Sequence, residues 1–138
     1  MATVKFQGIL FATVDNPPQV DLPEGMVPVD ELHITLLSSE LDKEARKRFK
    51  QAWAEKSDQL LPFPNVTFGP AYFADSGKKR SIACNVVEQN AVRQWVIACL
   101  VLLGIEADAY FKVYHVSVAN PTGSKFDSVP DPWRYRKG

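Results

Sequence analysis

Apolar and polar positions alternate over residues 4–14, and this period of two predicts an opening β-strand. One side of the strand is apolar, whereas the other side mixes Lys5 and Gln7 with Phe11. Charged and amide side chains on the mixed side indicate a border with solvent or with a cleft. Residues 15–31 follow with four prolines, which predict a long loop because proline blocks helices and central strands. Such a loop is either a plain connector or a lid over a site.

Two later stretches have the three- to four-residue spacing of amphipathic helices. The first covers about residues 41–60, after possible cap residues at 38–40. Acidic residues interrupt its lysines and arginines, which favours a solvated outer face over a nucleic-acid patch. The second covers about residues 90–103, with Asn90 as a possible cap and Gly104 at its C-terminal end. Its second half is apolar nearly all round, which predicts deep burial.

Short runs rich in β-branched and aromatic residues predict the remaining strands. Residues 66–74 and 81–88 would form a hairpin around a turn at 75–79, and further strands are expected at 106–111 and 113–119. Strands and helices alternate without a regular βαβ rhythm. The pattern therefore predicts an α+β fold with a mostly antiparallel sheet, in one domain over residues 1–138 with a tail at about 121–138.

Composition narrows the choice of partners. The chain of 138 residues is 46% hydrophobic, enough for a core, and its 16 basic residues balance 16 acidic ones. A protein that coats long double-stranded nucleic acid needs a basic excess, so this balance argues against one, while a small anionic ligand stays compatible. No stretch has the length of a membrane span and the start lacks signal-peptide character, so we expect a cytoplasmic protein without a membrane partner, acting as a monomer.

The cysteines and histidines do not match a metal site. Cys84 and Cys99 lie in apolar runs, which is typical of buried thiols in a reducing compartment. Together with the two histidines they have no spacing typical of zinc ligands. We therefore expect no metal and no cofactor.

The two histidines of the chain stand in matching contexts. His33 is followed two positions later by Thr35, and His115 is followed in the same way by Ser117. Both pairs lie in short apolar runs that predict strands, so each histidine shares a strand face with its hydroxyl residue. Only 13 of 138 residues are Ser or Thr, so both hydroxyls arising by accident is on the order of one in a hundred. The alternative is two unrelated histidines at strand edges.

This pair of motifs resembles the signature of the two-histidine (2H) phosphoesterase superfamily. The sequence Leu-His-Ile-Thr-Leu at residues 32–36 fits the first motif, and Tyr-His-Val-Ser-Val at 114–118 fits the second with Ser in place of Thr. The family includes RNA ligase/cyclic phosphodiesterases and compact phage enzymes that degrade cyclic oligonucleotides. The resemblance covers about residues 3–120. It implies a bilobed domain with pseudo-two-fold symmetry, helices on the outer faces and a central cleft.

The resemblance also implies an activity, the hydrolysis of a cyclic or 2′-linked phosphodiester in a nucleotide or RNA end. Neutral and protonated imidazoles of His33 and His115 would act as general base and general acid, in an order that stays open. Thr35 and Ser117 would hold the non-bridging phosphate oxygens. Candidate substrate-binding residues are cationic or aromatic: Lys5, Phe11, Tyr72, Phe73, Lys79 and Lys125.

Three classes of function are compatible with the sequence. The first is a phosphodiesterase for 2′,3′-cyclic phosphates or, as a phage-type anti-defence enzyme, for cyclic oligonucleotide messengers. The second is a non-catalytic module that binds nucleotides or RNA ends. The third is a structural interaction domain in which neither histidine matters.

Overall fold

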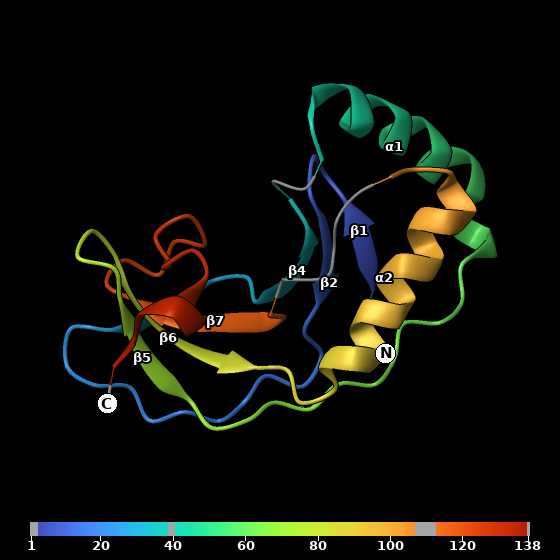
Figure 1. The fold of residues 1–138 in the computed structure, drawn as a ribbon. Helices are drawn as coiled ribbons and strands as arrows, with labels where there is room; N and C mark the ends of the chain where they lie inside the picture. The colour runs from blue at the N-terminus through green and yellow to red at the C-terminus, as the bar shows by residue number, and fades with distance from the viewer. Residues whose placement is uncertain (1–2, 39–40, 107–112, 138) are drawn as a thin grey trace.

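The protein folds as one antiparallel sheet with two α-helices, as the computed structural model of residues 3–38, 41–106 and 113–137 describes it (Figure 1). The α+β class and the antiparallel sheet predicted from the sequence are confirmed. In the described residues eight strands join one sheet in the order β1-β2-β4-β7-β6-β5-β8, and β3 pairs with β7. The strands are β1 (Val4–Phe6), β2 (Leu10–Thr13), β3 (Val27–Pro28), β4 (His33–Leu37), β5 (Tyr72–Asp75), β6 (Arg80–Asn85), β7 (His115–Asn120) and β8 (Arg136–Lys137).

The opening segment is a hairpin and not one strand. β1 and β2 pair antiparallel, with Val4 opposite Ala12, and Gly8 lies in the turn between them with φ +81°. Glycine adopts this left-handed conformation without the steric cost of a side chain. The alternation along the sequence nevertheless holds through β2, where Leu10 and Ala12 are completely buried. The apolar pattern alone did not reveal this turn, which divides the opening segment into two strands.

Helix α1 (Lys43–Lys56) begins one turn later than the predicted cap residues. Its cap is Asp42, whose Oδ1 accepts a hydrogen bond from the Ala45 amide at 2.7 Å. A carboxylate at this position satisfies one of the free amides at the start of a helix. Phe49 is completely buried on the inner side, as the spacing predicted. A short 3-10 helix (Ser57–Gln59) ends the segment.

Helix α2 (Gln89–Leu103) begins at the residue before the cap predicted at Asn90. Gly104 ends it with φ +69°, which confirms the predicted C-terminal glycine. The prediction of burial all round was wrong for the last turns, because Val101 is 77% exposed. Only the side of α2 that faces the sheet and α1 is covered.

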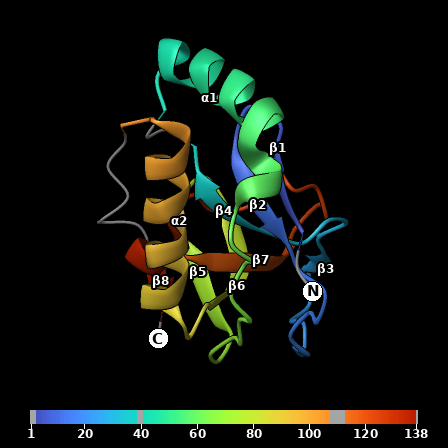
Figure 2. The same cartoon turned by 90° about the vertical axis from the view of Figure 1, so that its right-hand side faces the viewer.

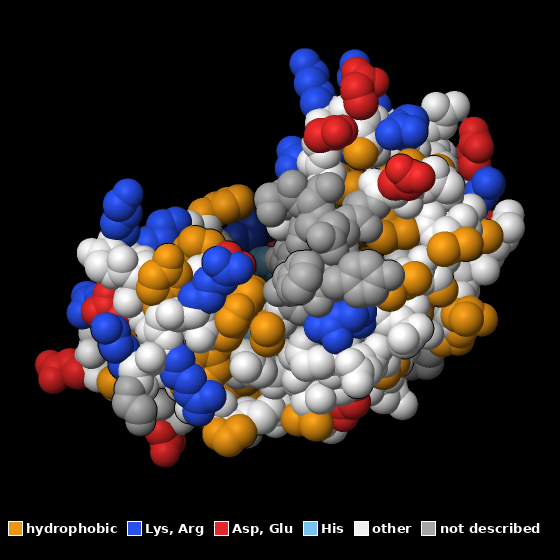
Figure 3. All heavy atoms as spheres, in the orientation of Figure 1, with side chains coloured by type: hydrophobic (Ala, Val, Ile, Leu, Met, Phe, Trp, Pro, Cys, Tyr) orange, Lys and Arg blue, Asp and Glu red, His pale blue; other side chains and the backbone are white. Residues whose placement is uncertain are grey.

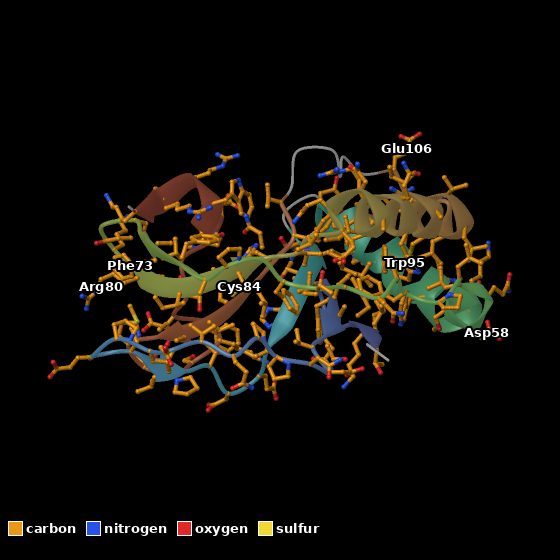
Figure 4. The ribbon with its side chains drawn as sticks, turned by 90° about the horizontal axis from the view of Figure 1, so that it is seen from below. Asp58, Phe73, Arg80, Cys84, Trp95 and Glu106 are labelled. Carbon is orange, nitrogen blue, oxygen red and sulfur yellow. The ribbon has the colours of Figure 1, made fainter. Side chains whose placement is uncertain are left out.

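Both helices pack on the same face of the sheet, where one core joins Leu36 of β4, Phe49 of α1 and Val96 of α2 (Figure 2). The other half of that face, formed by β6 and β7, is covered by the proline-rich loop. Met26 of this loop packs on a cluster that includes Cys84. Figure 4 shows the division, with Trp95 among the helices and Phe73 and Cys84 in the half without helices.

The C-terminal half closes the far edge of the sheet. β5 and β6 form the predicted hairpin, shorter than expected, around a turn in which Gly77 has φ +87°. The tail then passes through a short 3-10 helix (Pro132–Tyr135) into β8, which pairs with β5. The strand predicted at 106–111 falls almost wholly on residues 107–112, which lie outside the described residues.

Candidate functional site

The two histidine strands, β4 and β7, are antiparallel neighbours in the middle of the sheet. Ile34 lies opposite Val116, and both are completely buried on the face that carries the core. Alternation along each strand turns the histidines and hydroxyls to the other face. Continuing the register by one residue each way sets His33 across from Ser117 and Thr35 across from His115. Segments 82 positions apart in the sequence thus meet as direct neighbours.

This register places the four motif residues at the corners of a small rectangle. Side chains directly opposite in antiparallel strands have Cβ atoms about 4.5–5.5 Å apart, and diagonal neighbours about 7–8 Å. The two histidines occupy one diagonal and the two hydroxyl residues the other.

The same four side chains line one pocket of about 200 Å³. Figure 3 shows histidine atoms recessed in a hollow on this side of the molecule. The structure therefore brings together His33, Thr35, His115 and Ser117 in one pocket. Further residues in the wall come from the end of β4, the loop before it and the C-terminal segment: Val29, Ser38, Lys125, Ser128, Val129, Pro130 and Asp131.

His33 is held in place by its own strand and by β2. Its ring forms a hydrogen bond with the backbone carbonyl of Glu31, and the ring of Phe11 meets it edge-on at a centroid distance of 5.7 Å. Burial lowers the pKa of His33 below its ordinary value, and the charge of Lys125 acts in the same direction. The carbonyl and the carboxylate of Glu31 oppose this shift. His33 is therefore biased toward the neutral imidazole.

His115 has a matching local environment. Its Nδ1 lies 3.2 Å from the carbonyl oxygen of Val113, and the ring of Trp133 meets it edge-on at 5.3 Å. Because a carbonyl only accepts hydrogen bonds, this contact favours the tautomer with the proton on Nδ1. With the proton on Nδ1, Nε2 is the basic nitrogen of the ring. Both histidines are thus fixed by a carbonyl two positions earlier and by one aromatic ring.

Lys125 supplies a cation in the pocket wall. Its Nζ lies 3.0 Å from Oε2 of Glu31, and it sits 5.4 Å from the centroid of the Phe126 ring. The hydrogen bond from Lys125 holds the pKa of Glu31 below its ordinary value. Glu31 therefore contacts both the histidine ring, through its backbone, and the lysine, through its side chain.

The segment that carries Lys125 is anchored by Asn120, which is completely buried at the end of β7. Its Nδ2 donates hydrogen bonds to the Ser124 carbonyl at 2.7 Å and to Ser128 Oγ at 3.0 Å. Its Oδ1 accepts from the amides of Thr122 and Gly123. One amide side chain thus shapes the loop that forms a wall of the pocket.

Three predicted substrate-binding residues lie outside this pocket and outside the larger one described below. Tyr72 is 6% exposed and donates a hydrogen bond to Asn85 Oδ1 at 2.6 Å, and burial raises its pKa to about 12. Phe73 packs on the opposite face with the loop-covered core. Lys79 binds the Phe126 carbonyl at 2.7 Å. Both aromatic side chains therefore pack in the core, and the Lys79 side chain holds the loop that contains Phe126.

Sequence reasoning missed several residues of the site. Glu31, Asn120 and Asp131 carried no motif that distinguishes them from ordinary loop residues. Trp133 was noticeable as an aromatic residue in the tail, yet its contact with His115 follows from the pairing of β8 with β5. Long-range pairing of a two-residue strand has no signal in local periodicity.

A second, larger pocket of about 730 Å³ adjoins the first and shares His33 and Lys125 with it. Phe11, also a predicted binding residue, lies in its wall, as does Lys5. The other residues of the wall come from the β1–β2 hairpin, the loop before β4 and the C-terminal segment: Gln7, Ile9, Thr13, Val14, Glu31, Leu32 and Phe126.

Comparison with known proteins finds no matching family model, no matching curated protein and no matching solved structure. Over the described ranges, no helix is long and apolar enough to cross a membrane. Within the same part of the chain, no group of three or more His, Cys, Asp or Glu side chains is arranged to hold a metal ion.

Proposed function

We propose that the protein is a phosphodiesterase that needs no metal and hydrolyses a cyclic or 2′-linked phosphodiester in a nucleotide or RNA end. The observation that carries the proposal is the rectangle of His33, Thr35, His115 and Ser117 in one pocket. Two imidazoles on a diagonal, with a hydroxyl at each remaining corner, match the needs of one phosphate group. A cation, Lys125, lies in the same wall.

Each side chain has a defined task in the proposed reaction. A neutral imidazole takes a proton from water as the water oxygen attacks phosphorus, and the opposite, protonated imidazole gives its proton to the departing ribose oxygen. One P–O bond forms and one breaks, which yields a phosphomonoester and a free hydroxyl. Thr35 and Ser117 donate hydrogen bonds to the non-bridging oxygens, whose negative charge grows in the transition state.

The likeness of the two histidine environments supports the finer features of the proposed fold. His33 and His115 each bind a carbonyl two residues earlier and each meet an aromatic ring edge-on. We infer a pseudo-two-fold relation between the two histidine strands and their immediate contacts, with the pocket as a cleft between two lobes, although both helices lie on one of them. An enzyme of this kind attacks and protonates from opposite sides, which is the in-line geometry that phosphoryl transfer prefers.

The substrate is proposed to be small. The pocket of about 200 Å³ is sized for a phosphate with its immediate substituents, and the net charge of the chain is zero. Both 2′,3′-cyclic phosphate ends and cyclic oligonucleotides carry a phosphodiester that fits this description. Cleavage of cyclic oligonucleotides would make the protein an enzyme directed against nucleotide second messengers.

A substrate panel tests the proposal. Wild-type protein in EDTA is incubated with nucleoside 2′,3′-cyclic phosphates, 2′–5′ and 3′–5′ dinucleotides, and cyclic di- and trinucleotides, and products are separated by chromatography. We expect cleavage of at least one class of substrate. The rate of that cleavage is expected to fall by about 10²- to 10⁴-fold in His33→Ala and in His115→Ala. Binding without cleavage of any member would instead assign a non-catalytic nucleotide-binding module.

A further inference from the structure

The surroundings of the two histidines differ, although their local environments match. On the His33 side, the small pocket continues into the larger pocket of about 730 Å³ over the β1–β2 hairpin. On the His115 side, the ring faces Trp133 of the C-terminal segment. The room for a bulky substituent of the phosphate therefore lies beside His33.

The register of the sheet links the two pockets directly. Lys5 of β1 lies opposite Phe11 of β2, and Phe11 lies opposite Thr35 of β4. Thr13 of β2 lies opposite His33 in the neighbouring row. One continuous sheet face thus runs from the motif hydroxyl to the lysine at the edge of the hairpin, and a ligand on it meets both pockets.

The walls of the larger pocket combine three kinds of side chain. Phe11 and Phe126 offer aromatic rings, Gln7 offers an amide that both donates and accepts hydrogen bonds, and Lys5 and Lys125 offer positive charge. Phe126 is 78% exposed, although it is a large apolar side chain with no core role. Pockets for small organic ligands typically have volumes of about 300–1,000 Å³ and a few polar groups that fix orientation.

We propose that this larger pocket binds the nucleoside attached to the reacting phosphate, with its base against Phe126. A nucleobase has a flat face for stacking and a polar edge for an amide such as Gln7, which is the chemistry of this wall. Lys125 stands where the two pockets meet and exchanges its Glu31 carboxylate for the phosphate. The inference rests on the proposed function for the reacting group, and it adds the orientation: the nucleoside enters on the His33 side.

Binding to the His115→Ala variant tests the subsite without turnover. The probes are adenosine 3′-monophosphate, ribose 5-phosphate and inorganic phosphate, measured by titration calorimetry. Adding Phe126→Ala removes one stacking ring, so the dissociation constant for the nucleotide is expected to rise at least about fivefold, the lower end of base–aromatic stacking. The constants for ribose 5-phosphate and inorganic phosphate are expected to stay the same.

Val101→Ala is the matched control, because Val101 is 77% exposed on α2 and touches neither pocket. Phe126→Trp is expected to keep nucleotide affinity, and Gln7→Ala to change the ratio of affinities for adenosine and uridine monophosphates. Unchanged nucleotide binding in Phe126→Ala, or an equal loss for ribose 5-phosphate, would overturn the subsite.

The subsite and the proposed function fail in different ways. If wild-type protein binds nucleotides through Phe126 but cleaves no member of the substrate panel, the subsite stands and the proposed phosphodiesterase does not. If the panel is cleaved but Phe126→Ala binds and cleaves as wild type does, the subsite is wrong and the phosphodiesterase stands.

Discussion

The two histidine strands are alike in their immediate contacts and unlike in what lies beyond them. His33 and His115 are each held by a backbone carbonyl two residues earlier and by the edge of one aromatic ring. Beyond these contacts, His33 adjoins the Lys125–Glu31 ion pair and a large pocket, whereas His115 adjoins the ring of Trp133 in the C-terminal segment. Under the proposed function, this repeated local arrangement serves the two ends of an asymmetric ligand.

The largest effect should follow from loss of either imidazole. Under the proposed function, His33→Ala and His115→Ala each lower kcat/KM by about 10²- to 10⁴-fold, because each removes one proton-transfer partner. The double variant is expected to lose little more than the worse single variant, since the groups act in one step. Both are measured by single-turnover kinetics against Asn90→Ala, an exposed control on α2. Full activity in either single variant would show that the two histidines are not both required for proton transfer.

The next effect concerns the anchored segment beside His115. Asn120→Ala removes the partner of the buried Gly123 amide and of the partly buried Ser124 carbonyl, so the free energy of unfolding is expected to fall by about 1–3 kcal/mol. Urea unfolding measures the loss, and Asn90→Ala again serves as the exposed control. Because the segment also carries Lys125, phosphate affinity should fall in the folded variant. A fully stable Asn120→Ala protein would show that the wall of the pocket does not depend on this side chain.

The range over which a sequence pattern acts explains what the sequence did and did not predict about the two histidine strands. Period-two runs predicted the strands of His33 and His115, and a shared face for each hydroxyl, because these depend on local alternation. The likeness of the two motifs suggested a shared site, whereas the direct pairing of β4 with β7 through Ile34 and Val116 was not predicted. A local pattern predicts only the strand or helix in which it lies and not which other elements pair with it.

Contacts between distant segments explain what was missed. Trp133 reaches His115 only because two residues of the tail pair with β5, and Tyr72 is excluded because its hydroxyl binds Asn85 in the interior. An aromatic residue in a strand looks the same in sequence whether it faces a pocket or a core. The side on which it packs is decided by the register of its neighbours.

A smaller effect is expected at Trp133, which we regard as a positioning residue for His115. Trp133→Ala removes the aromatic edge that helps to orient the imidazole, so kcat should fall by roughly 10- to 100-fold. KM should change little, in contrast to Phe126→Ala, whose main effect is on KM. Trp133→Phe, which restores an aromatic edge, is expected to recover most of kcat. A loss confined to KM would place Trp133 in substrate binding instead.

The charges around His33 should produce a further asymmetry, visible by NMR because the chain has two histidines. Burial and Lys125 hold the pKa of His33 below its ordinary value, while Glu31 opposes them. Lys125→Met is therefore expected to raise the pKa of His33, and Glu31→Gln to lower it further. The titration of His115 in the same spectra is the internal reference. Equal shifts of both imidazoles would mean that the ion pair does not act on His33 in particular.

The smallest effect is on stability, and its sign follows from the same pKa. Because the folded protein holds the pKa of His33 below that of the unfolded chain, about 6.5, the unfolded state binds more protons on acidification. The stability that His33 contributes is thus complete above pH 6.5 and is lost as the pH falls from there through the lowered pKa. His33→Gln should remove this part of the pH dependence in urea unfolding between pH 5 and about 7.5. A slope in His33→Gln equal to that of wild type would assign the loss of stability to other groups.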